Sequence, residues 1–210
     1  MIQIKELNLS IKGRQILSNV NMDMHEGKVY GLIGNNGSGK TMLIKCICGF
    51  VKPTSGEVIV NDEVIGKDVD YIKDTGIIIE NPGFIVYYSG IRNLKMLSAI
   101  SGKADITKIR ETMKMCGLDP DLKLPVKKYS LGMRQRLGIA QAIMEDQSIL
   151  ILDEPMNGLD RDGVAAVRTL LLEMKAKGKL IILASHNRED IDILCDEVYN
   201  IENMMSTENN

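Results

Sequence analysis

Apolar residues fall into short blocks separated by glycine, proline and polar positions, and their spacing changes from strand-like to helix-like and back. In the first third, β-rich blocks bounded by turn residues predict short strands over Ile2–Leu9, Lys28–Ile33 and Glu57–Val60. Glycines lead from the second of these strands into an apolar stretch, Met42–Cys48, which predicts a helix. We therefore expect the order strand, loop, helix and then a hairpin.

The middle of the chain has a helical pattern. Gly76–Ile79 is another β-rich block, but over Phe84–Leu124 the apolar spacing becomes helical. Asp105 is a suitable N-cap for a helix that runs through Cys116. We therefore expect a helical lobe over about residues 84–130, inserted into a core of strands and helices.

Two continuous apolar blocks dominate the last third of the chain. Ile149–Leu152 and Leu180–Ala184 lack polar alternation, which is typical of parallel strands buried on both faces. A helical pattern between them indicates a crossover helix. The other elements expected here are helices over Arg134–Met144 and Val164–Ala176, a last strand over Val198–Ile201 and a short polar tail over residues 202–210.

Length and composition suit one globular domain. The chain has 210 residues, of which 44% are hydrophobic and 26% charged, so we expect a single domain over residues 1–210. The longest apolar runs, Phe84–Tyr88 and Leu180–Ala184, hold five residues each, whereas a membrane helix needs about 20. The N-terminus has no signal-peptide pattern. We therefore expect a cytoplasmic chain that does not itself cross a membrane.

Charge and cysteine usage exclude further classes. The 26 basic and 28 acidic residues give a net charge of −2, without a basic run, so we expect no nucleic-acid partner. Cys46, Cys48, Cys116 and Cys195 do not form the Cys-x-x-Cys pairs of a structural zinc site. We expect all four cysteines to be reduced and mostly buried.

A glycine-rich loop carries the most specific chemical signal. Residues 34–41 fit the pattern G-x-x-x-x-G-K-[ST] between an apolar strand and an apolar helix. Backbone N–H groups of such a loop point at phosphate oxygens, and the helix adds the positive end of its dipole. Lys40 would bridge the β and γ phosphates, and the Thr41 hydroxyl would ligate Mg²⁺. The predicted phosphate-binding residues are Gly34, Asn35, Asn36, Gly37, Ser38, Gly39, Lys40 and Thr41.

Polar side chains follow both buried apolar blocks. Asp153 and Glu154 come directly after the first block, and His186 comes shortly after the second. Ligand sites of parallel sheets lie at the carboxyl ends of the strands, so these side chains should face the phosphates. We expect Asp153 to hold Mg²⁺ through water. The predicted catalytic residues are Lys40, Glu154 and His186. Glu154 would polarise the attacking water, and His186 would contact the γ-phosphate.

Three further segments surround the acidic strand in a fixed order. They are Tyr129–Arg136, with the sequence Tyr-Ser-Leu-Gly-Met-Arg-Gln-Arg, then Asn157–Asp160 and Ala184–His186. They resemble the signature motif, D-loop and H-loop of ATP-binding-cassette (ABC) proteins, and the resemblance extends from about Ile2 to Ile201. It implies an α/β ABC ATPase fold. This fold has a P-loop NTPase core with a mostly parallel sheet, an N-terminal antiparallel β subdomain and an inserted α-helical subdomain.

The resemblance also implies an activity and partners. The family hydrolyses ATP with Mg²⁺ in a head-to-tail homodimer with two composite sites. Each nucleotide would lie between the phosphate loop of one subunit and the signature of the other. There Ser130 and the Gly132 backbone would face the γ-phosphate, and Asp160 would contribute from the D-loop. Formation and release of this dimer would do work on a separate transmembrane permease subunit.

Departures from the family pattern resemble one of its branches. Glu80 stands where the Q-loop usually has glutamine, and Leu131 and Met133 replace the usual signature residues. Both features resemble ATPases of the bacitracin-resistance and lantibiotic-immunity type, which serve ABC-2 permeases at the inner face of the plasma membrane. The implied function is export of a peptide antibiotic, drug or similar amphiphile. Glu80 would contact nucleotide and Mg²⁺ and add negative charge beside Asp153.

Two local features leave alternatives open. The adenine-stacking aromatic of the family is missing near Lys12-Gly13, so adenine would rest on Arg14 or Ile16 or be held weakly, and the preference for ATP over GTP stays open. Phe84–Tyr88 holds three of the eight aromatic residues. It would either form a groove for a permease helix or belong to the core of the helical lobe.

Other function classes fit the sequence less well than an exporter ATPase. An ABC ATPase of translation or DNA repair usually has two cassettes, a long coiled coil or basic extensions, and none is present in this sequence. In this sequence, only Glu80 and the altered signature favour an exporter subunit over an importer subunit. A catalytically inactive interaction module is disfavoured by the presence of Lys40, Asp153, Glu154 and His186.

Overall fold

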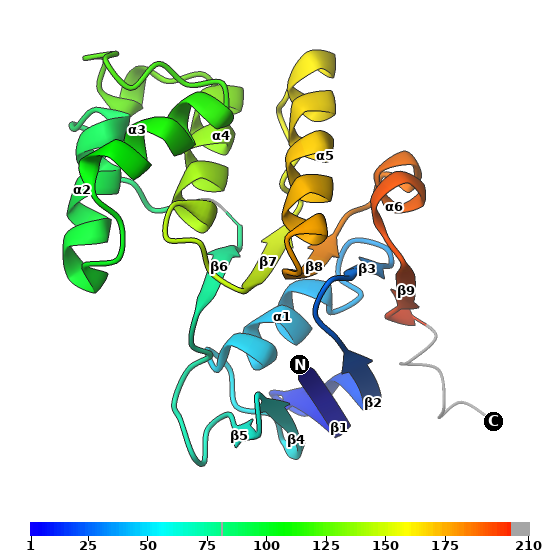
Figure 1. The fold of residues 1–210 in the computed structure, drawn as a ribbon. Coiled ribbons are helices and arrows are strands. Elements are labelled where there is room, and N and C mark those ends of the chain that lie inside the picture. Colours follow the sequence, from blue (N-terminus) through cyan, green and yellow to red (C-terminus); the bar gives the residue numbers. More distant parts are fainter. Residues whose placement is uncertain (81, 203–210) are drawn as a thin grey trace.

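The chain folds into two β-sheets with helices between and around them (Figure 1). The computed structural model describes residues 1–80 and 82–202. The strands are β1 (Ile2–Ile11), β2 (Arg14–Met24), β3 (Val29–Ile33), β4 (Ser55–Val60), β5 (Glu63–Val64), β6 (Thr75–Ile78), β7 (Ile149–Asp153), β8 (Leu180–Ala184) and β9 (Glu197–Asn200). The helices are α1 (Lys40–Cys48), α2 (Gly90–Ser101), α3 (Ile106–Met115), the 3-10 helix η1 (Val126–Lys128), α4 (Leu131–Ile143), α5 (Arg161–Ala176) and α6 (Arg188–Leu194).

The two sheets differ in strand direction. The order β2-β1-β4-β5 forms the antiparallel sheet, and β6-β7-β8-β3-β9 forms the parallel sheet. The two continuous apolar blocks become β7 and β8, and every residue of both strands is buried. This arrangement confirms the predicted α/β class, with a parallel core sheet and an N-terminal antiparallel sheet.

Successive residues of the parallel sheet face two separate cores. Ile149 and Ile151 pack into a cluster with α1 and the antiparallel sheet, whereas Leu150 and Leu152 pack with α3, α4 and α5. Figure 1 shows α1 lying between the two sheets. Because both faces of β7 are covered, a polar residue at any of its first four positions would lose water without gaining a partner.

No strand was predicted between Ile2–Leu9 and Lys28–Ile33, and this prediction is wrong. Strand β2 occupies this segment and pairs along β1. Val20, Met22 and Met24 alternate into the core, but Leu17 is out of step with them because the backbone is irregular at Asn19, where φ is 46°. This irregularity breaks the period of two by which strands are recognised in sequence.

The helical lobe begins later than the apolar spacing predicts. Residues 82–89 form no helix, and α2 starts at Gly90. The Asn93 side chain holds this segment in place by accepting a hydrogen bond from the Ile85 backbone N–H (2.8 Å) and donating one to the Ile85 carbonyl (3.1 Å). A helical reading of Phe84–Tyr88 is therefore wrong. Asp105 caps α3 as predicted, accepting a hydrogen bond from a backbone N–H of the first turn.

A close contact between β6 and α4 fixes one edge of the parallel sheet. At Gly76 in β6, a Cβ atom would lie 1.8 Å from the carbonyl oxygen of Ala142 in α4. Only glycine allows this approach. The contact packs the edge strand β6 closely against the last turn of α4.

Other expectations concern membranes and the chain end. Within the described residues, no helix combines the length and apolar character that crossing a bilayer requires. The polar tail predicted over residues 202–210 lies outside the described part of the chain, except for Glu202. Cys46, Cys48 and Cys116 are buried, Cys195 is partly buried, and all four are free thiols, as predicted.

Candidate active site

The loop between β3 and α1 folds around its own lysine. Lys40 is only 7% exposed, and its Nζ donates hydrogen bonds to the carbonyl oxygens of Gly34 (2.6 Å) and Asn35 (3.2 Å). The first glycine is required because φ there is +149° and a Cβ atom would lie 2.5 Å from the Ser38 hydroxyl oxygen. The backbone therefore curls around the ammonium group.

Donor groups gather at the start of α1. Its N-cap, Gly39, is left-handed (φ 95°) and offers no side-chain hydrogen bond to the first turn. The buried hydroxyl of Ser38 has no hydrogen-bond partner among the described residues. Together with the Lys40 ammonium group and the helix dipole, these donors suit phosphate oxygens.

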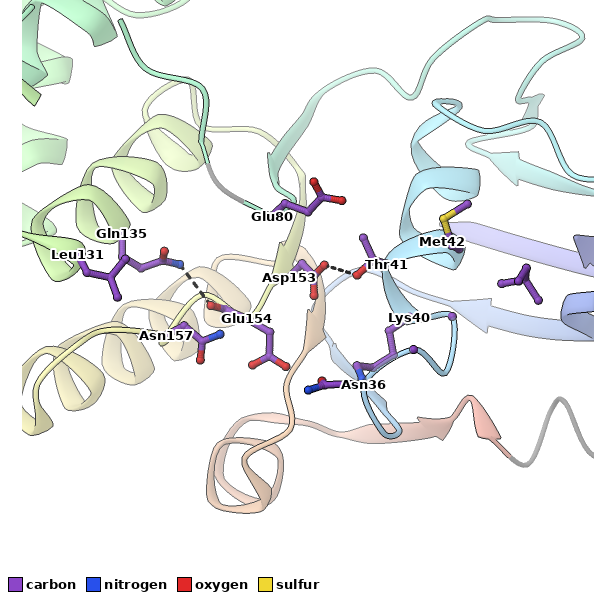
Figure 2. A pocket seen from close by; sticks show the side chains of 13 residues that line it. Asn36, Lys40, Thr41, Met42, Glu80, Leu131, Gln135, Asp153, Glu154 and Asn157 are labelled. Carbon is purple, nitrogen blue, oxygen red and sulfur yellow. Dashed lines mark hydrogen bonds between the residues drawn. The ribbon is translucent and has the colours of Figure 1, made fainter. Parts of the chain in front are cut away.

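A cavity of about 450 Å³ opens in front of this loop (Figure 2). This volume lies in the usual range of small-ligand pockets. Asn36, Gly37 and Gly39 line it, whereas Gly34 and Asn35 line a neighbouring cavity together with His186. The other polar residues that line the first cavity are Lys40, Thr41, Glu80, Gln135, Asp153, Glu154 and Asn157.

Two oxygen ligands meet where β7 ends beside α1. The Thr41 hydroxyl donates a hydrogen bond of 2.7 Å to Asp153 Oδ2, and Figure 2 shows the two side chains turned toward each other. Asp153 is the last residue of β7 and is buried. A hydroxyl and a carboxylate oxygen at this spacing suit Mg²⁺, which prefers hard oxygen ligands.

Glu154 and His186 lie in direct contact across two strand ends. The backbone N–H of Glu154 bonds to the Ala184 carbonyl (2.9 Å), which ties the end of β7 to the end of β8. Glu154 Oε1 accepts a hydrogen bond from the His186 backbone N–H (3.1 Å), and Oε2 lies 2.8 Å from His186 Nδ1. The ring therefore presents Nδ1 to the carboxylate, which leaves Nε2 to reach another group.

The sequence around this cavity matches a known family. A family profile described as ABC transporter matches residues 17–157. The chain belongs to this ABC family. It is 43% identical over 93% of its length to the uncharacterized ABC transporter ATP-binding protein YybJ of Bacillus subtilis, of which it covers 90%. It is 39% identical over 93% of its length to the lantibiotic transport ATP-binding protein SrtF of Streptococcus pyogenes, of which it covers 84%.

A third relative is longer than this ABC ATPase. The chain is 35% identical over 94% of its length to the bacitracin transport ATP-binding protein BcrA of Bacillus licheniformis, and it spans 65% of that protein. These relatives confirm the resemblance to the lantibiotic and bacitracin branch. The protein is thus the ATP-binding and ATP-hydrolysing subunit of an ABC transporter.

Solved structures confirm the fold of the ABC ATPase. An ATP-binding subunit of an ABC transporter superposes with a TM-score of 0.85 at 25% identity, covering 96% of this chain and 87% of the other. A dimeric bacterial ABC transporter cassette superposes with a TM-score of 0.84 at 21% identity, covering 96% of this chain and 95% of the other. At 21% identity, the second superposition shows that the two proteins share a fold.

Three residues expected to contact the nucleotide of this ABC ATPase, Ser130, Gly132 and Asp160, do not line the phosphate-loop cavity. Ser130 caps α4 and accepts a hydrogen bond from the Met133 backbone N–H (3.1 Å), and Asp160 caps α5. Both residues line a further cavity with Gly132 and Arg136, whose guanidinium lies 3.2 Å from Asp160. Within one chain, the structure therefore does not bring Ser130, Gly132 and Asp160 to the phosphate loop.

Glu80 lines the phosphate-loop cavity but already has a partner. Its backbone is left-handed (φ 57°), and its Oε1 accepts a hydrogen bond of 2.6 Å from Lys45 Nζ. Lys45 belongs to α1, the same helix that follows the phosphate loop. The negative charge that the sequence places beside Asp153 is therefore offset by a cation of this helix.

Lys45, which pairs with Glu80, and Gln135, which lines the cavity, are not among the site residues predicted from the sequence. Lys45 belongs to no motif, and its partner Glu80 is 35 positions away. Gln135 lies inside the signature segment, and its Nε2 donates to the carbonyl oxygens of Glu154 (3.3 Å) and Pro155 (3.0 Å) (Figure 2). Its place in that segment was a signal, but its contact with the acidic strand end depends on how α4 packs.

Proposed function

We propose that this ABC ATPase drives a separate ABC-2 permease that exports a peptide antibiotic or a similar amphiphile. The observation that carries this proposal is the 39% identity to a lantibiotic transport ATPase, most of whose length the chain covers. The 35% identity to a bacitracin transport ATPase supports the same substrate class. In this function the chain would lie at the inner face of the plasma membrane, bound to the permease.

The phosphate loop binds the nucleotide in this proposal. Lys40, withdrawn from the carbonyls of Gly34 and Asn35, would donate to phosphate oxygens instead. Ile16 is the only one of the candidate base contacts that lines the cavity, and it is aliphatic. The adenine base would therefore pack against an apolar side chain without a stacking ring.

Mg²⁺ would be held by Thr41 and Asp153, with Glu80 as a further ligand. When bound, the ion neutralises phosphate charge. Glu154 would act as the general base, accepting the proton of the attacking water on its carboxylate. His186 holds that carboxylate at both oxygens and has Nε2 available for the γ-phosphate.

The second half of each site would come from a partner subunit. Ser130, Gly132 and Asp160 lie in a cavity of their own. The N-terminus of α4 there would meet the γ-phosphate of a nucleotide bound to another copy of the chain. A head-to-tail homodimer that forms with ATP accounts for both cavities.

An exposed apolar segment beside Glu80 would receive the permease. Tyr87 is 72% exposed, and Ile85 and Val86 are also exposed. The segment is held in place by the backbone N–H of Lys127, which bonds to the Val86 carbonyl (2.8 Å). Lys127 Nζ also lies 4.7 Å from the Tyr87 ring centre. A short permease helix could pack against such a fixed apolar surface.

Co-purification with a membrane protein tests the proposal. We expect the chain to co-purify with a multi-helix membrane protein encoded beside it, and this protein to stimulate ATP hydrolysis. Tyr87→Ser should weaken the complex while ATP binding is retained. Ile193→Ser is the matched control, because Ile193 is an exposed apolar residue on α6. Association with ribosomes instead of a membrane protein would refute the exporter role.

A further inference from the structure

A buried ion pair joins α5 to α6 outside the phosphate-loop cavity. Asp190 is 1% exposed, and its Oδ1 accepts hydrogen bonds from Arg168 Nε (2.8 Å) and Nη2 (2.6 Å). Arg168 also pairs with the exposed Glu189 (3.1 Å), and hydrogen bonds to Glu189 and Asp190 raise the pKa of its guanidinium. A carboxylate buried so deeply is costly unless its oxygens are partnered.

The second oxygen of Asp190 faces the turn that carries His186. Asp190 Oδ2 lies 3.4 Å from the hydroxyl oxygen of Ser185, which is itself buried. The same hydroxyl oxygen accepts a hydrogen bond from the Asn187 backbone N–H (3.1 Å). Because a serine hydroxyl has one proton, that proton is left to point at Asp190. The hydroxyl of the residue before His186 therefore also holds the backbone of the residue after it.

The turn held in this way reaches the acidic strand end. His186 contacts Glu154 through its backbone N–H and through Nδ1. The His186 side chain is itself largely exposed, so its own surroundings do little to fix it. The orientation of the ring depends on the backbone between Ser185 and Asn187.

We infer that Asp190 is a positioning residue for ATP hydrolysis: it orients the Ser185 hydroxyl and thereby sets His186 against Glu154. Arg168 holds the Asp190 carboxylate in place through its two hydrogen bonds to Oδ1. The inference rests on the proposed roles of Glu154 and His186. A second explanation is that the ion pair only joins α5 to α6, in which case its loss would lower stability and leave His186 in place.

Two variants separate these explanations. Asp190→Asn removes the charge at nearly constant size. Ser185→Ala leaves the ion pair between Arg168 and Asp190 intact and removes only the hydroxyl that connects it to the turn. Glu189→Gln is the matched control, because Glu189 is the exposed carboxylate partner of Arg168 and makes no hydrogen bond to Ser185 within the described part of the chain.

The first readout is the His186 ring itself. The chain has two histidines, so NMR of the full chain labelled at histidine gives two sets of ring signals, and His25 serves as the internal reference. We expect Asp190→Asn and Ser185→Ala to shift the His186 signals, while Glu189→Gln leaves them in place. Unchanged His186 signals in both test variants would overturn the inference, whatever Glu154 does in hydrolysis.

The second readout is the rate of ATP hydrolysis. Asp190→Asn and Ser185→Ala should lower kcat about tenfold to 100-fold, the scale of a misplaced catalytic group, with KM for ATP nearly unchanged. In a His186→Ala background the same substitutions should lower kcat no further. An equal loss in both backgrounds would show that Asp190 acts independently of His186 and would refute the positioning role.

Discussion

Lys45 Nζ donates a hydrogen bond of 2.6 Å to Glu80 Oε1, joining the helix after the phosphate loop to the end of β6. Glu80 lines the same cavity as Thr41 and Asp153, the proposed Mg²⁺ ligands. Glu80 is thus held by a cation of its own chain, and it would have to change partner to ligate a metal.

Removing either partner should change the dependence of hydrolysis on Mg²⁺. Lys45→Ala frees the Glu80 carboxylate and should lower the Mg²⁺ concentration at half-maximal rate. Glu80→Gln should raise that concentration while Mg-ATP binding is retained. The Glu80 side chain is 64% exposed, so solvent limits each effect to about twofold to fivefold. The measurement is a Mg²⁺ titration of ATPase rate at fixed ATP.

A surface ion pair elsewhere provides the control for this titration. Lys73 pairs with Glu63 at 2.8 Å, and both side chains are well exposed. Lys73→Ala should leave the Mg²⁺ curve of the wild type unchanged. Superimposable curves for all variants would show that Glu80 does not contact the metal. The same titration with the permease present tests whether Glu80 also affects coupling.

Glu154→Gln should bind ATP but hydrolyse it at least about 100-fold more slowly, because the amide cannot accept the proton of the attacking water. The variant should accumulate as an ATP-bound dimer, while the nucleotide-free chain is a monomer or a weak dimer. Sedimentation with and without Mg-ATP measures both states. A tight dimer without nucleotide would contradict the composite site, and a wild-type rate would remove Glu154 from its role.

Lys40→Ala should weaken ATP binding about tenfold or more, because hydrogen bonds between charged groups contribute about 1.5–3 kcal/mol. The loop should also lose the contacts that curl Gly34 and Asn35 around the ammonium group. Binding of a fluorescent ATP analogue measures the loss. The exposed Lys52, which follows α1, provides the control. Equal affinities of Lys40→Ala and Lys52→Ala would exclude the proposed contact.

The cysteines should resist alkylation in the folded protein. Burial raises the pKa of Cys46 to about 11 and that of Cys116 to about 12. Since the thiolate is the nucleophile, less than about one part in 100 of either thiol is reactive at pH 8. Mass spectrometry after iodoacetamide treatment should show no adduct natively and four after unfolding. Rapid native labelling of Cys116 would contradict its buried position.

Local sequence patterns were enough to predict the parallel strands, the phosphate loop and one helix cap of this protein. The apolar runs in β7 and β8 indicated parallel strands because no position in either strand meets water. The phosphate loop was recognisable because its glycines and Lys40 act over a few adjacent residues. The Asp105 cap depends on one turn of helix. Each of these signals arises from neighbours in the sequence, and so it can be read without knowing the fold.

Contacts between distant residues were decided only by the tertiary structure. Strand β2 was hidden because a backbone irregularity at Asn19 breaks its alternation, and pairing with β1 compensates for it. The apolar residues of the segment before α2 suit either a helical or a non-helical backbone, and hydrogen bonds with the Asn93 side chain hold the non-helical one. The pairing of Lys45 with Glu80 and of Arg168 with Asp190 has no local signal. Long-range packing brings these charges together, and packing depends on the whole chain.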